Sequence, residues 1–325
     1  MKLKKIKRMV AVGTAILMTL SLAGCGIGSD SVKLGAAGVG GGYYAFSNAF
    51  AQIASSEDED LDFEVKATAG STANIRLLSD GYVDMAIAQA DLVDAAYNGT
   101  GATDKKRYRG YSAVASLYTE ACQIVVRADS GIDSLDDLQG KKISVGEEES
   151  GTQRNAEQIL KMTGLVESLV DTVNLDYVDA ANELKSGQID AFFCTAGIQT
   201  SVIEELSKEC DVKLIGIDDK CRDRLKFVYG FYTDYTIPAG TYEGQDQDVE
   251  TLGVRAVLLA RDDMDDEIVE ELTGLLFEHA QDIQYSIALT FQIDESEAVK
   301  NVTIPFHDGA KAYYQKKGIE IPAEQ

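Results

Sequence analysis

Short apolar segments alternate with amphipathic ones along most of this chain, and this alternation strongly limits the folds open to it. The first strands are expected at Val32–Ala36, Leu61–Thr68 and Val83–Ala88. Helices are expected over Tyr43–Ser55, over Asn74–Ser79 with Ser71 as the N-cap, and over Asp91–Tyr97. The order β-α-β-α-β is typical of a mostly parallel sheet with helices on its faces.

A second series of the same kind follows. Its strands are expected at Gln123–Arg127, Lys142–Val145, Val173–Tyr177, Ile189–Cys194 and Val212–Ile217. Its helices are expected over Gly151–Met162, Ala180–Ser186 and Gln199–Lys208. The last expected elements are a strand at Val254–Ala260 and helices over Glu267–Ile283 and Gly309–Lys317.

Two similar α/β series predict a two-lobed clamshell, with chain crossings near residues 117–123 and 250–257. The first lobe is then split in sequence, comprising residues 31–119 and 256–325, and the second lobe comprises residues 120–255. A length of 325 residues, 45% of them hydrophobic, is ample for two cores. The formal net charge of −24 argues against a nucleic-acid partner, since no basic surface would neutralise phosphates.

The N-terminus has the pattern of a secretory signal. Five basic residues precede Met9, an uncharged apolar run follows to Leu22, and Leu22-Ala23-Gly24-Cys25 comes next. This end resembles the lipobox of bacterial lipoproteins, which implies that residues 1–24 are removed and that Cys25 carries lipid. Residues 25–30 would be a tether to the outer face of a bacterial cell membrane. The alternative is an ordinary signal or N-terminal anchor with a chance cysteine.

The other cysteines, Cys122, Cys194, Cys210 and Cys221, have no C-x-x-C spacing. Both disulfides and free buried thiols remain open for them. The chain has only two histidines, so we expect no metal site.

Three polar loops follow strands or open helices, and they are the candidate binding site. They are Gly38–Tyr44, Ala69–Asn74 and Glu149–Arg154. Glycines allow close backbone approach, and a following helix offers free N–H groups to an anionic group. Since ligands in α/β sheets bind at the carboxyl ends of strands, the three loops are expected to converge, with Gln89 at the same rim.

These loops are open to other interpretations. Gly38 and Gly40 fit a dinucleotide fingerprint, but Tyr43 takes the place of the third glycine. A structural turn, or for Ser71 only an N-cap, is the plain alternative. No nucleophile motif surrounds His279 or His307, and Glu147–Glu149 is more typical of a solvated charge run, so neither an enzyme nor a cofactor is expected.

The motifs together resemble the TAXI family, the substrate-binding subunits of one class of TRAP transporters. The matching segments are Gly38–Tyr44, Ala67–Asn74, Met85–Asp91, Ser150–Thr152, Ile237–Tyr242 and His307–Ala310, in that order. The resemblance implies a type II periplasmic-binding-protein-like fold and no catalysis. It also implies a small organic acid or amino acid, glutamate-like among the options, as ligand, and a membrane permease of the TRAP type as partner. Gly197-Ile198-Gln199 departs from the family's usual G-x-P.

By the matching loops, the ligand-binding residues are expected to be Gly40, Gly42, Tyr43, Ser71, Asn74, Gln89, Ser150, Gly151 and Thr152, with Arg154 as a candidate carboxylate partner. Arg76 is a second such candidate, although an exposed helix arginine is the plain interpretation of both. The glutamates at 147–149 favour an amine-bearing solute. The competing functions are a binding protein of an ATP-driven (ABC) importer, a secreted enzyme on a Rossmann-like core, and a sensory lipoprotein. A monomer is expected in each case.

Overall fold

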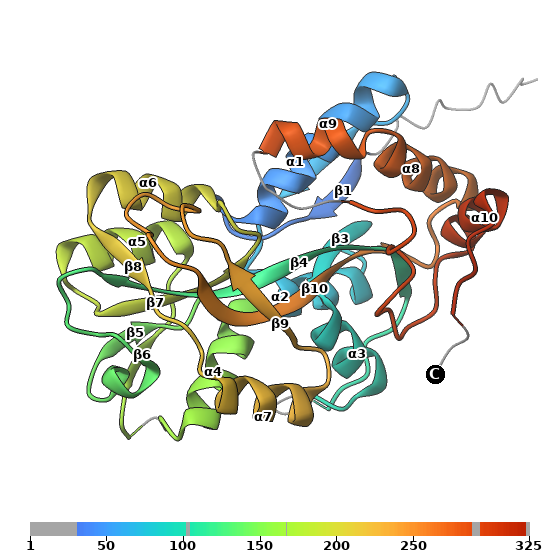
Figure 1. Ribbon diagram of the computed structural model, residues 1–325. Coiled ribbons are helices and arrows are strands. Elements are labelled where there is room, and N and C mark those ends of the chain that lie inside the picture. The colour runs from blue at the N-terminus through green and yellow to red at the C-terminus, as the bar shows by residue number, and fades with distance from the viewer. Residues whose placement is uncertain (1–30, 102–104, 167, 288–292, 323–325) are drawn as a thin grey trace, which may run out of the picture. The chain divides into compact units, whose positions relative to one another are not determined.

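A computed structural model describes residues 31–101, 105–166, 168–287 and 293–322 (Figure 1). The strands are β1 (Val32–Gly35), β2 (Phe63–Lys66), β3 (Met85–Gln89), β4 (Tyr111–Arg127), β5 (Lys142–Ser144), β6 (Asp171–Val173), β7 (Ala191–Ala196), β8 (Val212–Leu214), β9 (Thr233–Ile237) and β10 (Val249–Arg261). The helices are α1 (Gly42–Glu57), α2 (Ser71–Ser79), α3 (Ala90–Asn98), α4 (Gly151–Thr163), α5 (Tyr177–Ser186), α6 (Ser201–Glu209), α7 (Asp219–Tyr229), α8 (Asp266–Glu278), α9 (Ala280–Ile287) and α10 (Asp308–Lys317), with a 3-10 turn η1 (Leu135–Leu138). None of the helices in these ranges is long and apolar enough to cross a membrane.

Within the described residues, ten strands form one sheet in the order β2-β1-β3-β10-β4-β7-β5-β6, with β8 beside β4 and β9 beside β10. The strands at each end pair in parallel, β1 with β2 and β3, and β5 with β6 and β7. The two central strands pair antiparallel with each other and with their neighbours. The predicted α/β class is confirmed, and the sheet is mixed because the chain returns through its centre twice.

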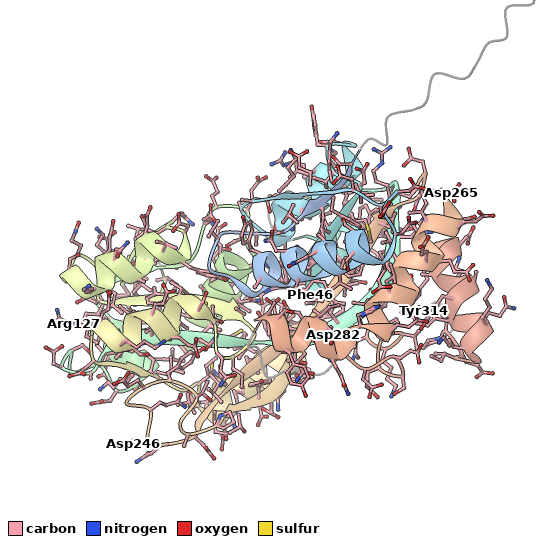
Figure 2. All side chains as sticks on the ribbon, turned by 90° about the horizontal axis from the view of Figure 1, so that it is seen from above. Phe46, Arg127, Asp246, Asp265, Asp282 and Tyr314 are labelled. Atoms are coloured by element: carbon pink, nitrogen blue, oxygen red, sulfur yellow. The ribbon has the colours of Figure 1, made fainter. Side chains whose placement is uncertain are left out.

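Side chains pack into separate cores on the two halves of this sheet. The core of the first lobe joins residues from Leu34 to Tyr118 with residues from Ala256 to Tyr314. The second lobe has one core on each face of its sheet, built from residues between Cys122 and Val254. In Figure 2 the labelled Phe46 and Tyr314 lie in the first lobe, and Arg127 and Asp246 lie in the second.

The two lobes share the long strands β4 and β10. Their antiparallel register runs from Gly253 opposite Ala121 to Arg261 opposite Tyr111. It shifts between Arg255 and Val257 and again between Leu258 and Leu259. Such irregularities bend a strand and increase its local twist. The pair is therefore a continuous but bent ribbon between the lobes.

Several elements differ from the sequence expectation. The helix expected over Glu267–Ile283 is two helices, because the chain leaves helical geometry at His279. Ser71 does not cap α2 but is its first residue, and Gly70 takes the cap position with φ +121°, which favours glycine. Helix α7 and strand β9 were not predicted. The cysteines Cys122, Cys194, Cys210 and Cys221 are free thiols.

Asn74 fastens α2 to the sheet of the first lobe. The fully buried side chain donates from Nδ2 to the carbonyl oxygens of Gly35 (3.3 Å), Ala36 and Ile87 (2.8 Å). Its Oδ1 accepts a hydrogen bond from Thr68 Oγ1 at 2.7 Å. The amide therefore satisfies carbonyl groups at the end of β1 and in the middle of β3.

Asn74→Ala is expected to lower the free energy of unfolding by about 2 kcal/mol, because buried acceptors lose their donor. Urea denaturation of both proteins measures the difference. Asn48→Ala is the matched control, since the exposed Asn48 side chain bonds only to Tyr44 O within its own helix. The control should change stability by less than about 0.5 kcal/mol, because alanine is the better helix former. Equal effects of the two substitutions would contradict the role given to Asn74.

Candidate functional site

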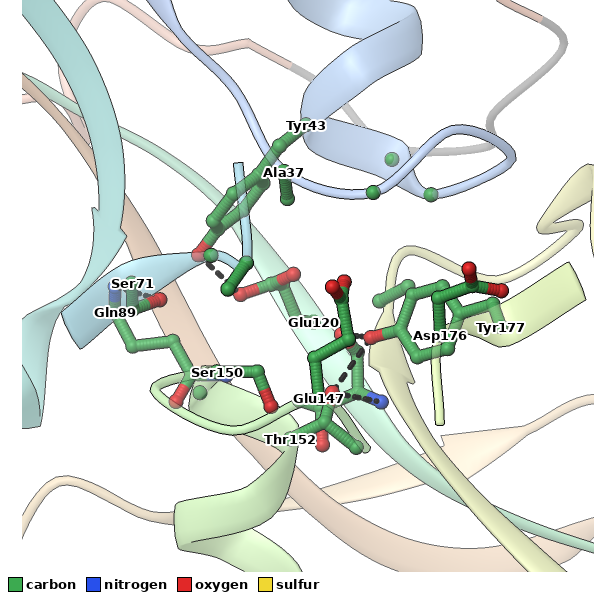
Figure 3. A pocket seen from close by; sticks show the side chains of 18 residues that line it. Ala37, Tyr43, Ser71, Gln89, Glu120, Glu147, Ser150, Thr152, Asp176 and Tyr177 are labelled. Atoms are coloured by element: carbon green, nitrogen blue, oxygen red, sulfur yellow. Dashed lines mark hydrogen bonds between the residues drawn. The ribbon is translucent and has the colours of Figure 1, made fainter. Parts of the chain in front are cut away.

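A pocket lies where loops and helix starts of the two lobes meet (Figure 3). Including its opening to solvent, the space measures at most about 460 Å³, so it admits only a small molecule. The first lobe contributes Ala37, Gly38, Gly41, Gly42, Tyr43, Ala69, Gly70, Ser71 and Gln89. Strand β4 contributes Glu120, and the second lobe contributes Glu147, Ser150, Gly151, Thr152, Asp176, Tyr177, Thr195 and Ala196.

Four helices, α1, α2, α4 and α5, begin at this pocket. The first N–H groups of a helix have no partner within the helix and carry partial positive charge. Those of Gly42, Tyr43, Gly151 and Thr152 donate to no group in the described part of the chain. These N–H groups are therefore available to an acceptor in the pocket.

Glu120 is the most unusual residue of the pocket, since this acidic residue is only 2% exposed. Tyr43 Oη donates to its Oε2 at 2.6 Å. Burial raises the pKa of Glu120 to about 8, and the bonds from Tyr43 and Gln89 act in the opposite direction. Burial also raises the pKa of Tyr43 well above its usual value, and the neighbouring Glu120 adds to this shift. The pair is thus a buried acid held by a neutral phenol.

The wall from the second lobe is fixed by an internal network. Thr152 Oγ1 lies 2.6 Å from Tyr177 Oη and accepts from the backbone N–H of Thr195 at 3.2 Å. Tyr177 Oη in turn donates to Thr195 O at 3.1 Å. Thr152 therefore orients the Tyr177 ring at the pocket.

Glu149 joins the lobes directly. Its carbonyl oxygen accepts from the N–H groups of Thr72 and Ala73, at 3.1 and 3.2 Å, at the start of α2. Its carboxylate accepts from Arg76 Nε and Nη2, at 3.1 and 2.7 Å. Glu149 has φ +67°, a conformation that costs a non-glycine residue free energy. The Glu149 contacts hold the loop before α4 against the first lobe.

A second link between the lobes runs through Gln89. Its Nε2 donates to Asn155 Oδ1 at 3.0 Å, and Asn155 Nδ2 donates to Tyr232 Oη at 2.8 Å. Tyr232 Oη then donates to Gln158 Oε1. The amide of Gln89 also lies against Gly151, where an added Cβ would come within 2.5 Å of Gln89 Cδ. Glycine at 151 therefore permits the close approach of the lobes.

The structure brings together most of the residues expected from the sequence. Gly42, Tyr43, Ser71, Gln89, Ser150, Gly151 and Thr152 all line the pocket. Gly40 lies beside the second lobe, where its carbonyl accepts from Ser201 Oγ at 3.2 Å. The Asn74 side chain is bound to backbone carbonyl groups instead of facing the pocket. Arg154 lies outside the lining. Burial raises the pKa of Asp91 to about 6, and the charge of Arg154 opposes this rise.

The candidate carboxylate partner Arg76 is instead bound to Glu149. The run Glu147–Glu149 is not simply solvated, since Glu147 lines the pocket and Glu149 joins the lobes. Sequence reasoning missed Glu120, Asp176, Tyr177 and Thr195. Cys25 and the signal segment lie outside the described residues.

Known proteins share this architecture. A model of the NMT1-like family matches residues 34–318. A protein of known structure from Bordetella bronchiseptica RB50 is 16% identical, with 89% of this chain and 98% of that chain covered and a TM-score of 0.58. A putative L-cystine ABC transporter from Listeria monocytogenes is 14% identical, with 79% and 93% covered and a TM-score of 0.50.

At these identities the structural likeness concerns the fold, and it confirms the predicted two-lobed architecture of periplasmic binding proteins. The family match covers most of the sequence. This chain belongs to the NMT1-like family.

Proposed function

We propose that this protein is an extracytoplasmic solute-binding protein that captures a small organic acid or amino acid between its lobes and delivers it to a membrane transporter. No catalytic step is part of this function. The lobes proposed to close on the solute are residues 31–119 with 256–325, and residues 120–255.

The observation that carries the proposal is the meeting of the three polar loops at one pocket. Gly42, Ser71 and Gly151 come from helix starts on both sides of it. A ligand in this position contacts both lobes, so it binds the closed arrangement better than an open one and favours closure. The family and the shared fold support the same function.

For the transporter, an ATP-driven importer is the first candidate, supported by the likeness to the putative L-cystine ABC transporter. A TRAP-type permease is the second, supported by the order of the TAXI-like motifs. Uptake of the identified solute by cells separates them. Orthovanadate should stop an ATP-driven importer, whereas an ionophore that dissipates the ion gradient should stop a TRAP-type permease.

We further propose that Cys25 carries the lipid that holds the protein at the outer face of the cell membrane. Cys25→Ala should move the protein from the membrane fraction to the soluble fraction or leave the precursor unprocessed. Immunoblots of fractionated cells measure this. A variant distributed and processed like the wild type would refute the anchor without affecting the binding function.

Binding itself is tested on the full-length chain in detergent micelles. Native mass spectrometry identifies any retained solute, and calorimetry against amino acids and organic acids follows after unfolding and refolding remove it. Hydrogen bonds to charged groups predict a Kd in roughly the nanomolar to micromolar range. The proposal would be overturned if the protein retained no solute and gave no heat of binding with any member of the panel.

Gly151→Ala is expected to weaken solute binding by roughly 10- to 100-fold, since overpacking costs about 1–3 kcal/mol. The cost falls on the closed state because the new Cβ meets Gln89 of the other lobe. The thermal midpoint of the ligand-free protein should change little. Gly274→Ala in α8, outside the pocket, is the control and should bind like the wild type. Unchanged affinity in Gly151→Ala would argue against closure at this contact.

A further inference from the structure

The carboxyl groups around the pocket are not balanced by any basic group of the lining in the described residues. Glu120, Glu147 and Asp176 line it, and the lining contains no arginine, lysine or histidine in the part of the chain that the structure describes. Arg76 is engaged by Glu149, and Arg154 lies outside the lining. Like charges close together in a partly buried space repel a further anion and attract a cation.

Gln89 provides an independent observation. Gln89 lines the pocket and is 2% exposed, and its Nε2 donates a hydrogen bond to Asn155 Oδ1. The donors that run from Asn155 through Tyr232 to Gln158 set the orientation of this amide. Its Oε1 is left as a buried acceptor with no donor in the described residues. A buried acceptor without a partner is costly, and a donor on a bound molecule would remove that cost.

We propose that the pocket selects a small molecule of zero or positive net charge that carries a protonated amine, with the Glu120 carboxylate and Gln89 Oε1 accepting hydrogen bonds from the ammonium group. Tyr43 holds the Glu120 carboxylate in place through its 2.6 Å hydrogen bond. An acidic group on the same molecule has the free N–H groups of Gly42 and Gly151 as donors. The inference rests on the proposed function and narrows its ligand to amines, excluding organic acids that lack one.

The sign of the pH dependence follows from the surroundings of Glu120. The titratable groups that act on it or feel its charge are Tyr43 of α1, Asp91 of α3, Tyr118 and Cys122 of β4, Tyr177 of α5 and Cys194 of β7. None of them is a cation, and burial raises the pKa of Glu120 to about 8.

An ammonium group favours the charged carboxylate and lowers the pKa of Glu120, so binding releases a proton. Affinity for an amine therefore rises with pH between 6 and 8.5, whereas affinity for an anion falls.

Matched pairs of solutes test the inference by calorimetry on the full-length, ligand-free protein. The pairs are L-alanine with L-lactate, L-serine with L-glycerate, and L-asparagine with succinamate, each compared at pH 6.5 and 8.5. In at least one pair the amine should bind ~10- to 100-fold more tightly than its partner, with affinity rising with pH.

Glu120→Gln should weaken amine binding ~10- to 100-fold and remove the pH dependence. Glu148→Gln is the matched control, because it makes the same chemical change at an exposed position beside the pocket, and it should bind like the wild type.

The inference would be overturned if an acid without an amine bound as tightly as its amine partner and its affinity fell as pH rose. The proposed binding function would still stand. Full amine affinity in Glu120→Gln would also overturn the inference. Failure of every solute in these pairs, together with no retained solute in native mass spectrometry, would overturn the proposed function as well.

Discussion

Glu120→Gln should make the ligand-free protein more stable than the wild type at pH 9, by up to roughly 4 kcal/mol. The pKa of Glu120 is raised from 4.5 to about 8 by burial. Between these values the folded state keeps a proton that the unfolded state releases, so stability falls as pH rises. Above pH 8 the folded protein holds a buried charge and the loss is complete. Glutamine keeps the shape and avoids the charge.

Urea denaturation at pH 6 and pH 9 measures this effect. The wild type should lose stability between the two values and the variant should lose less. Some decline remains in the variant, because burial also raises the pKa of Asp91, to about 6. Glu148→Gln, with an exposed side chain, should follow the wild type. Parallel pH profiles for wild type and Glu120→Gln would show that Glu120 is ionised in the folded protein at neutral pH.

Gly309→Ala should destabilise the protein by about 3 kcal/mol or more, since a Cβ there has no room. It would lie 2.2 Å from the carbonyl oxygen of Asp266 and 2.9 Å from the backbone nitrogen of Glu270. Both are backbone atoms of α8, so relief requires α10 to move away from it. Thermal or urea denaturation measures the loss.

Gly274→Ala, in α8 of the same helix pair, is the matched control. It is expected to stabilise the protein slightly instead of destabilising it. Its Cβ would make an ordinary contact of 3.4 Å with the Tyr313 ring. Alanine in a helix interior is favoured over glycine by about 0.5–1 kcal/mol. A loss of stability in Gly274→Ala as large as in Gly309→Ala would mean that close packing at Gly309 is not the cause.

Local patterns predicted the parts of the fold that depend on local physics. The strand expected at Val83–Ala88 is β3, and the helix expected over Gly151–Met162 is α4. The length of β4 was not predictable, because Gln123–Arg127 is only the end of a strand that begins at Tyr111 and changes partners. Helix α7 was missed although Asp218 caps it and Gly230 ends it in the left-handed conformation.

The residues of the candidate site were predictable where they lie in loops with a recognisable sequence pattern. Glycine and hydroxyl residues before helices identified Gly42, Ser71 and Gly151, because helix starts and strand ends gather at one edge. Glu120 was not found, since a strand residue has no loop pattern around it. A single carboxylate between the apolar residues of Tyr111–Arg127 was the available signal. Asn74 was expected at the ligand because its loop resembles a TAXI-family loop, but tertiary packing uses its amide for backbone carbonyls.

The ribbon of β4 and β10 limits the lobe motion that the proposed function requires. No flexible loop joins the lobes at these crossings, and the pairing from Gly253 to Arg261 continues across the join. Separation of the lobes therefore flexes paired backbone instead of breaking it, and the two shifted registers are the places that yield most easily. A bent paired ribbon resists changes in its curvature, so it would bring the lobes back to the same alignment after each release of the proposed solute.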